Sequence, residues 1–253
     1  VLGEEVLKEN TFIDYIFVGE YEYTLLDLVK GNNLRNILGL IYREGSKIRV
    51  NPRRPVIEDL DGLPWPARHF LPIKKYSDAF CGLPTPSLQI WASRGCPYKC
   101  IFCMWPEVMY GGHRYRTRNP IKVVDEIEWC VKEYGFRSVY FDDDIFNIGK
   151  DRILRLSQEI KRRIKLPWAI MARADTMDEE MLKAMNDSGL YALKYGVESG
   201  VQEILDRSGK DLGLNKVTKM VKLTKEFGIK VHLTFTFGLP GENWTESGSN
   251  SAA

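Results

Sequence analysis

Apolar and polar positions follow a regular pattern from residue 87 onward. Five short apolar segments of strand length recur, and longer segments with apolar residues at helical spacing lie between them. Most of the helical segments are followed by a glycine, a residue that commonly ends a helix. Strands that alternate with helices in this way predict an α/β fold with a parallel sheet. The predicted strands lie near residues 88–93, 137–142, 167–172, 191–197 and 230–237.

The helices predicted between these strands carry recognisable start signals. Asn119 followed by Pro120 is expected to cap the first helix. Thr176 and Glu179 are expected to form a capping box for the third, and Asn215 to open the fourth. The apolar stripes are expected at Ile121, Val124, Ile127, Val131 and Tyr134 in the first helix and at Ile153, Leu156, Ile160 and Ile164 in the second.

Residues 1–86 have a different composition, because more than half of the twelve prolines lie there. Dense proline disfavours long helices and central strands, so residues 51–86 are predicted to be a proline-rich linker. Before it, the pattern predicts a buried strand at 12–19, a short helix at 23–30 and a hairpin of strands 37–42 and 47–50. The small polar residues 247–253 predict a disordered tail.

Charge and hydropathy narrow the function classes. The net charge of +2 over 253 residues gives no case for a nucleic-acid partner. No apolar run approaches the roughly 18–20 residues that span a bilayer, and the N-terminus lacks the pattern of a secretion signal. Three of the five cysteines lie within eight residues, which favours metal ligation over a disulfide framework. A cytoplasmic location is therefore expected.

The clustered cysteines are Cys96, Cys100 and Cys103, spaced C-x3-C-x2-C just after the first predicted strand. Ligands bind at the carboxyl edge of parallel sheets, and that is where this segment is expected. Three thiolates can hold three irons of a [4Fe–4S] cluster and leave the fourth iron open. A zinc site completed by His113 and three unrelated core cysteines are the alternatives. Cys81 and Cys130 are expected to be buried, inert thiols.

Residues 95–103, Gly-Cys-Pro-Tyr-Lys-Cys-Ile-Phe-Cys, resemble the signature of the radical S-adenosylmethionine (SAM) superfamily. Residues 103–111 and 116–128 resemble its cobalamin-associated branch, which includes proteins similar to anaerobic magnesium-protoporphyrin monomethyl ester cyclase. The resemblance implies that residues 87–246 form a partial (βα)6 TIM-like barrel whose last strand is missing. It also implies that residues 1–50 are the C-terminal remnant of a cobalamin-binding Rossmann-like domain.

The resemblance further implies a SAM site, because the open iron of such a cluster binds SAM. Asp142 or Asp143 would contact the amino group of SAM, Arg173 its carboxylate, and Glu198 its ribose or neighbouring atoms. The adenine would lie near Phe102, Gly238 and Gly241. The resemblance assigns no catalytic residue beyond these, and cobalamin is expected as a cofactor only of a longer parent protein.

These residues and the resemblance lead to an enzyme hypothesis, an oxidoreductase or a transferase. The enzyme would cleave SAM to a 5′-deoxyadenosyl radical for C–H activation of an apolar or macrocyclic small molecule, in a methylation or a cyclisation. An external one-electron donor of the flavodoxin or ferredoxin type would supply the electron. The alternatives are a tRNA-modifying, methylthiotransferase-like enzyme and a non-catalytic fragment that binds a cluster or zinc.

Overall fold

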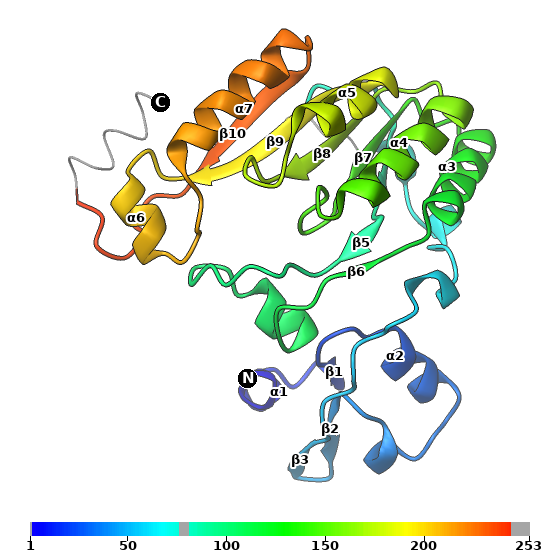
Figure 1. The fold of residues 1–253 in the computed structure, drawn as a ribbon. Coiled ribbons are helices and arrows are strands. Elements are labelled where there is room, and N and C mark those ends of the chain that lie inside the picture. Colours follow the sequence, from blue (N-terminus) through cyan, green and yellow to red (C-terminus); the bar gives the residue numbers. More distant parts are fainter. Residues whose placement is uncertain (1, 76–80, 244–253) are drawn as a thin grey trace. The chain divides into compact units, whose positions relative to one another are not determined.

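The computed structural model describes residues 2–75 and 81–243, which fall into two compact units (Figure 1). The first unit comprises the chain up to Glu58 and the segment Cys103–Arg114. The second comprises Asp59–Phe102 and the chain from Tyr115 onward. The predicted disordered tail at 247–253 lies outside the described residues.

The second unit is built on a five-stranded parallel sheet, as the sequence predicts. Its strand order is β10-β9-β8-β7-β4, so each strand in the series pairs with the next one along the chain. The predicted α/β fold is thereby confirmed. The strands are β4 (Ser87–Ile90), β7 (Ser138–Phe141), β8 (Trp168–Ala172), β9 (Leu190–Glu198) and β10 (Lys230–Phe235).

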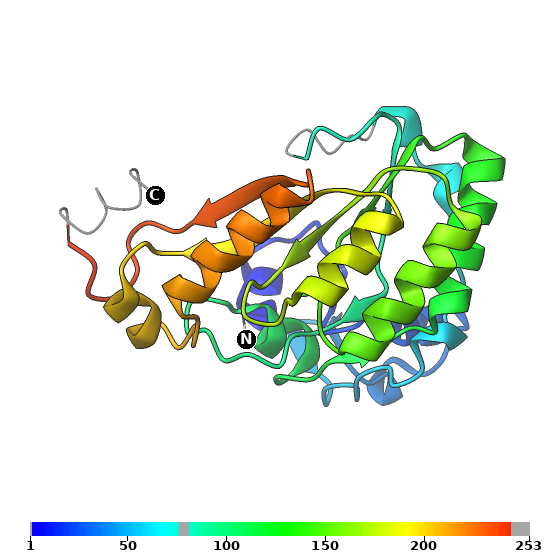
Figure 2. The same cartoon turned by 45° about the horizontal axis from the view of Figure 1, so that its top comes forward.

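Helices cover one face of this sheet (Figures 1 and 2). They are α3 (Pro120–Tyr134), α4 (Lys150–Arg163), α5 (Glu179–Asp187) and α7 (Leu214–Glu226). A short helix that the sequence pattern does not predict, α6 (Gln202–Arg207), lies between β9 and α7. The unit also contains the short antiparallel pair β5 (Ser93–Arg94) and β6 (Arg116–Thr117).

The helix caps agree with the sequence only in part. The side chain of Asn119 accepts the backbone N–H of Ile121, as predicted for α3. The capping box predicted for α5 is wrong. The side chain of Asp178 accepts the N–H of Met181, whereas the Thr176 hydroxyl donates to the Arg173 carbonyl. A carboxylate next to the first turn satisfies an unpaired N–H better than a hydroxyl two residues earlier.

Two further helix predictions need correction. Helix α7 begins at Leu214 with Gly213 before it, one residue earlier than the start predicted at Asn215. In α3 the stripe is displaced, because Ile121 is 53% exposed whereas Val123 and Cys130 are buried. The apolar spacing is correct for the rest of the helix, and the error falls on its first turn. The stripe predicted for α4 is buried as expected.

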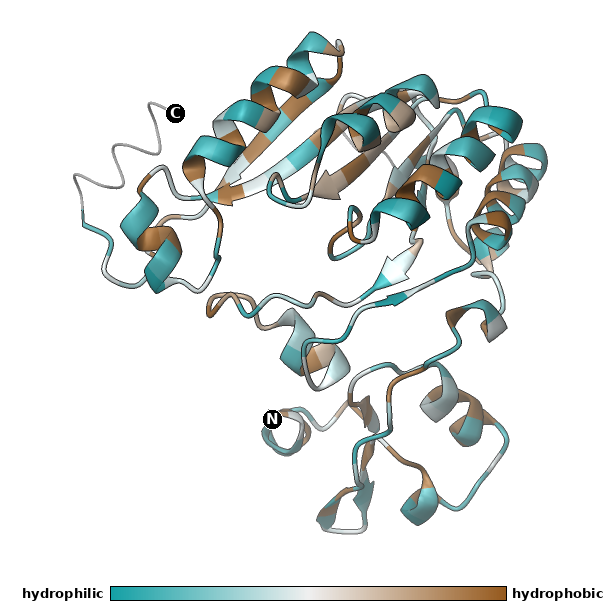
Figure 3. Cartoon of the chain, viewed as in Figure 1, coloured by the Kyte–Doolittle hydropathy of each residue, from teal (hydrophilic) through white to brown (hydrophobic). Residues whose placement is uncertain are grey.

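The main core fills the space between the sheet and its helices. Large apolar side chains from one face of the strands, among them Phe141 and Trp168, pack there, and the Trp168 indole N–H donates to the Ser188 carbonyl. Figure 3 shows apolar positions on the strands and polar positions on the outer sides of the helices. Since side chains alternate along a strand, the second face of the sheet carries a different set. Tyr140, Ala169 and Ala192 on that face pack with Cys81 and Leu83.

The first unit contains a small antiparallel sheet of strand order β1-β2-β3. Its predicted helix and hairpin are confirmed, but the strand predicted as buried at 12–19 is shorter and partly exposed, with Phe12 81% exposed. The elements are α1 (Gly3–Glu9), β1 (Tyr15–Phe17), α2 (Glu22–Val29), β2 (Leu40–Glu44), β3 (Lys47–Val50), the 3-10 turn η1 (Leu34–Asn36) and the π-helix η5 (Pro106–Tyr110).

The proline-rich segment forms only 3-10 turns in its described part, at η2 (Leu60–Gly62), η3 (Arg68–Phe70) and η4 (Ile73–Lys75). It is nevertheless anchored within the second unit. Arg68 donates to the buried carboxylate of Glu126 on α3, at 2.7 Å. Arg118 forms a second ion pair with that carboxylate, also at 2.7 Å. Among the described helices, none is both long enough and apolar enough to span a bilayer.

Candidate SAM and cluster site

The segment that leads to the cysteines is held by two carboxylates that follow β7. The Asp143 carboxylate accepts the Ala92 N–H at 3.1 Å and the Ser93 hydroxyl, and the Asp144 carboxylate accepts the Gly95 N–H at 2.6 Å. Because β4 and β7 are parallel neighbours, their carboxyl ends bring these groups together. The route into Cys96 is therefore fixed by the next strand of the sheet.

Asp143 is only 3% exposed, and this burial raises the pKa of its carboxyl to about 7. The nearby Arg152 guanidinium and the two hydrogen bonds lower the pKa and offset part of that effect. Asp142, by contrast, is exposed, and its backbone N–H donates to the Ile90 carbonyl. The sequence groups these acidic residues as equivalent candidates, but the fold gives them different surroundings.

Arg173 lies just beyond β8, and its side chain is buried, with the residue 6% exposed. Its guanidinium forms two hydrogen bonds with Asp175, at 2.8 and 2.9 Å, and stacks over the Tyr98 ring at 3.7 Å from the ring centre. It also donates to the Lys210 carbonyl at 2.7 Å. Although burial opposes the charge, Asp175 and neighbouring groups raise the pKa of Arg173, so it is a permanent cation beside the cysteine segment.

The far end of the cysteine segment is anchored to the turn after α6. The Ile101 N–H donates to the Ser208 carbonyl at 2.9 Å. Gly209 has a φ of +64°, and a Cβ there would lie 3.0 Å from the Lys99 carbonyl oxygen. Only glycine accommodates both this conformation and this close approach at no steric cost.

Glu198 ends β9 in a strained conformation, with a φ of +74°. Its carboxylate accepts Lys210 Nζ at 3.0 Å and the Thr236 hydroxyl at 2.8 Å, so it links β9 to the end of β10. The Lys210 Nζ lies 5.9 Å from the centre of the Phe102 ring. Strain at a residue that is held by several partners is typical of functional positions.

Gly196 makes room for this ion pair. A Cβ there would lie 2.8 Å from the Glu198 carboxylate and 3.1 Å from Lys210 Nζ. Beyond β10, Gly238 and Gly241 have φ values of +81° and +82° and form an exposed turn. The Glu242 carboxylate accepts the N–H groups of Gly238 and Leu239 and closes that turn.

The five cysteines are all thiols in the part of the chain that the structure describes. Cys81 and Cys130 are buried as predicted, and burial raises the pKa of the Cys130 thiol to about 11. Cys96 and Cys100 are half-buried in the second unit, and Cys103 is the exposed first residue of the segment 103–114. Within the described residues, no three His, Cys, Asp or Glu side chains already form a closed set of metal ligands.

The donor chemistry nevertheless fits an iron–sulfur cluster. Burial, then Asp175, and to a smaller extent Cys96 and Cys100 raise the pKa of Tyr98. Burial lowers the pKa of Arg173, but Asp175, and to a smaller extent Tyr98 and Cys100, raise it overall, so both thiols lie near these residues. A permanent cation favours the thiolate form that ligates iron. Half-buried thiols on a loop with two anchored ends can accept a cluster without unfolding the sheet.

Two parts of this arrangement have no clear signal in the sequence. The turn at Ser208–Gly209 and Lys210 both contact the site, yet neither belongs to the cysteine pattern. Lys210 follows a short helix that the pattern does not predict. The Ser-Gly pair indicates a turn, but its contact with the Lys99 carbonyl depends on how the chain returns to the sheet.

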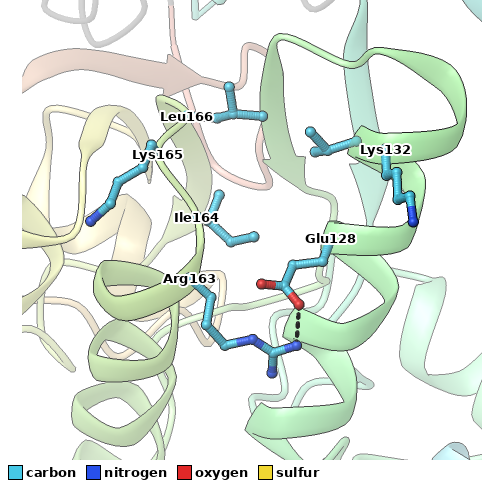
Figure 4. A pocket seen from close by; sticks show the side chains of 7 residues that line it. Glu128, Lys132, Arg163, Ile164, Lys165 and Leu166 are labelled. Carbon is cyan, nitrogen blue, oxygen red and sulfur yellow. Dashed lines mark hydrogen bonds and ion pairs between the residues drawn. The ribbon is translucent and has the colours of Figure 1, made fainter.

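A shallow groove lies at the opposite, amino edge of the sheet (Figure 4). Arg163, at the end of α4, pairs there with Asp125 and Glu128 of α3. Residues 164–166, which precede β8, form another wall. The groove is therefore separated from the cysteine segment by the length of the strands.

Comparisons with known proteins match this site to a family. A model described as the radical SAM superfamily matches residues 92–247. A protein named "uncharacterized methyltransferase" in Pyrococcus horikoshii is 34% identical, covering 96% of this chain and 53% of that protein. The anaerobic magnesium-protoporphyrin IX monomethyl ester cyclase of Rubrivivax gelatinosus is 31% identical, covering 94% and 44%. The chain thus spans about half the length of the curated relatives it matches.

A solved structure shares the fold. The radical SAM methyltransferase TsrM of Kitasatospora setae, solved with cobalamin and a [4Fe–4S] cluster, superposes with a TM-score of 0.74 at 21% identity. That match covers 98% of this chain and 50% of TsrM. Since the family model covers more than half of the chain, including the cysteine segment, the predicted family is confirmed, and the chain belongs to the radical SAM superfamily.

Proposed function

We propose that Cys96, Cys100 and Cys103 hold a [4Fe–4S] cluster and that the protein uses SAM to activate a C–H bond of a small-molecule substrate. The observation that carries this proposal is the anchoring of the cysteine segment. Asp143 and Asp144 hold its start, and the Ser208 carbonyl holds its end. When bound, the cluster supplies the electron that cleaves SAM to methionine and a 5′-deoxyadenosyl radical.

The residues at the carboxyl edge would bind and orient SAM. Arg173 uses its Nε and Nη2 groups for Asp175 and for backbone carbonyls, and we assign its Nη1 group to the SAM carboxylate. Asp142 is exposed at the end of β7, and we assign it, rather than the buried Asp143, to the SAM amino group. Asp143 would instead position the loop that carries Cys96.

The other end of SAM would lie near β9 and β10. Glu198 is assigned to the ribose, and its ion pair with Lys210 would fix the orientation of its carboxylate. Phe102, half-buried next to Lys210, would contact the adenine. The turn of Gly238 and Gly241 would let backbone approach the same ring. Such positioning accounts for most of what a protein contributes to radical chemistry.

The chain spans about half the length of these relatives, so the overall reaction is a proposal for the whole protein. These relatives include one named as an uncharacterized methyltransferase and one named as a cyclase, so we propose a methylation or a cyclisation of an apolar or macrocyclic molecule. Cobalamin, present in the TsrM structure, is proposed as a cofactor of the longer protein. The proposed electron donor is of the flavodoxin or ferredoxin type. The division into a cobalamin-binding remnant at 1–50, a linker at 51–86 and a partial barrel at 87–246 also remains a proposal.

The experiment is electron paramagnetic resonance on protein reconstituted anaerobically with iron and sulfide, reduced, with and without SAM. We expect a [4Fe–4S]⁺ signal whose g values change when SAM is added. Cys96→Ala should abolish that signal, whereas Cys130→Ala, which removes a buried cysteine on α3, should retain it. A signal that does not respond to SAM, or zinc uptake in place of iron, would contradict the proposal.

A further inference from the structure

The second face of the sheet, opposite the helices, carries a lysine on one of its inner strands. Lys194 lies in the middle of β9, a central strand whose neighbours are β8 and β10. Strands of parallel sheets are usually near-continuous apolar runs, and an ammonium on such a strand requires polar partners. Lys194 therefore places a cation on the face of the sheet that the helices do not cover.

Lys194 has a defined partner across the sheet. Its Nζ lies 3.2 Å from the Tyr140 hydroxyl and 4.6 Å from the centre of the Tyr140 ring. Tyr140 belongs to β7, so these two side chains meet over the intervening strand β8. The residue of β8 in register with Tyr140 is Ala169, and the residue of β9 in register with Ala169 is Ala192. Both are small, and they leave the space that the two long side chains cross.

Apolar side chains border the Lys194–Tyr140 pair on one side. Cys81 and Leu83 pack on Tyr140, Ala169 and Ala192, so apolar side chains close the face toward the amino edge of the strands. Lys194 lies two residues beyond Ala192 on β9 and is half-buried. His232, its register partner on β10, is half-buried too. The polar groups therefore lie between this apolar floor and the carboxyl edge, where we propose that SAM binds.

The distance to that edge suits a small molecule. Glu198 lies four positions beyond Lys194, which corresponds to about 13 Å along a strand. A substrate could thus present its reacting carbon at the edge and its other end to Lys194. The lysine ammonium, the tyrosine hydroxyl and the imidazole of His232 all suit negatively charged oxygen.

We propose that Lys194, with Tyr140 and His232, binds an oxyanion of the substrate, either a carboxylate or a phosphonate-type group. That the anion belongs to the substrate rests on the proposed function. The anion site itself can be tested without cluster or SAM.

The experiment measures how small anions protect individual lysines from reductive methylation by formaldehyde and dimethylamine–borane, with the modified positions quantified by peptide mass spectrometry. The probes are methylphosphonate in one arm and acetate in the other, with sodium chloride at matched ionic strength as the blank. Lys230, on the same face near Tyr191, and the exposed Lys222 of α7 are internal controls. We expect one anion to protect Lys194 at a concentration about tenfold or more below that needed for either control.

Two variants sharpen the result. Tyr140→Phe and His232→Gln should each raise the protecting concentration severalfold, provided that their thermal melting stays cooperative. Equal protection of all three lysines by both anions, or no protection of Lys194, would overturn the inference. Protection of Lys194 in a protein whose cluster ignores SAM would uphold the anion site and remove only its assignment to a radical SAM substrate.

Discussion

The two edges of the parallel sheet carry similar charged residues in very different environments. At the carboxyl edge, Arg173 and Lys210 are nearly buried and donate to carboxylates, and Arg173 also donates to backbone carbonyls. At the amino edge, Arg163 pairs with Glu128 at the rim of an open groove, where the Glu128 side chain is 43% exposed. Charge composition alone would not separate the two edges.

Burial and shared partners, rather than the number of ion pairs, therefore distinguish the carboxyl edge, where the SAM site is proposed, from the amino edge. An exposed pair is worth about 1 kcal/mol or less, whereas breaking a buried pair costs about 3–5 kcal/mol. A protein keeps costly buried charges where it needs fixed geometry. Residues of the carboxyl edge should therefore respond to substitution more strongly than matched residues elsewhere in the second unit.

The largest effect is expected for Arg173→Met. The change leaves the Asp175 carboxylate and the Lys210 carbonyl without their donor and removes the cation over Tyr98. We expect a loss of about 3–5 kcal/mol in the free energy of unfolding, measured by urea denaturation. Arg162→Met, an exposed residue at the end of α4, should change it by no more than about 0.5 kcal/mol. Equal losses would erase the contrast between the edges.

A pH dependence is expected from Asp143. Its pKa in the folded protein is about 7, above the usual value of 3.8, so the folded state holds a proton that the unfolded state releases between about pH 4 and 7. The contribution of Asp143 to stability is therefore full below pH 4 and is lost as the pH rises to 7, by up to about 1.4 kcal/mol per pH unit. Denaturation of cluster-free protein across this range, compared with Asp143→Asn, should show a flatter slope in the variant. A parallel slope in both would assign the effect to other groups.

The coupling energy between the two partners of an ion pair, measured by a double-mutant cycle, should be larger at the carboxyl edge than at the amino edge. We expect Lys210→Met and Glu198→Gln to show a coupling energy of about 1–3 kcal/mol in unfolding, because their side chains are 7% and 14% exposed. The same cycle for Arg163→Met and Glu128→Gln should give about 1 kcal/mol or less. A larger coupling at the groove would mean that the amino edge is the more constrained one.

The smallest effect is expected for Gly196→Ala. The added Cβ would meet the Glu198 carboxylate and Lys210 Nζ, so we expect a loss of about 1–2 kcal/mol, measured as a lower Tm. Gly213→Ala is the matched control, since its φ is −79° and no atom lies within 4 Å of the new Cβ. Because Gly213 is the N-cap residue of α7, where alanine is less favourable than glycine, Gly213→Ala should cost only about 0.5 kcal/mol. An unchanged Tm for Gly196→Ala would show that the ion pair can shift.

Much of the fold could be predicted because it depends on local patterns. The five strands and the helices between them follow from apolar spacing, and Asn119 caps α3 as its position before a proline predicts. The wrong predictions concern positions where neighbouring residues could take the same role or where a short segment could face either way. Asp178 caps α5 in place of Thr176, and Phe12 is exposed in a region predicted to be a buried strand. Apolar character alone does not say which face a short segment turns to the core.

The sequence by itself determined the cysteine spacing, the family and the parallel α/β order, because these depend on neighbours along the chain. Only the tertiary structure decided that Asp143 is buried against Ser93, that Lys210 pairs with Glu198, and that Lys194 reaches Tyr140 over β8. These contacts join residues from 12 to 54 positions apart. Their partners depend on sheet register and on the path of the returning loops, which packing of the whole domain fixes and local propensity does not.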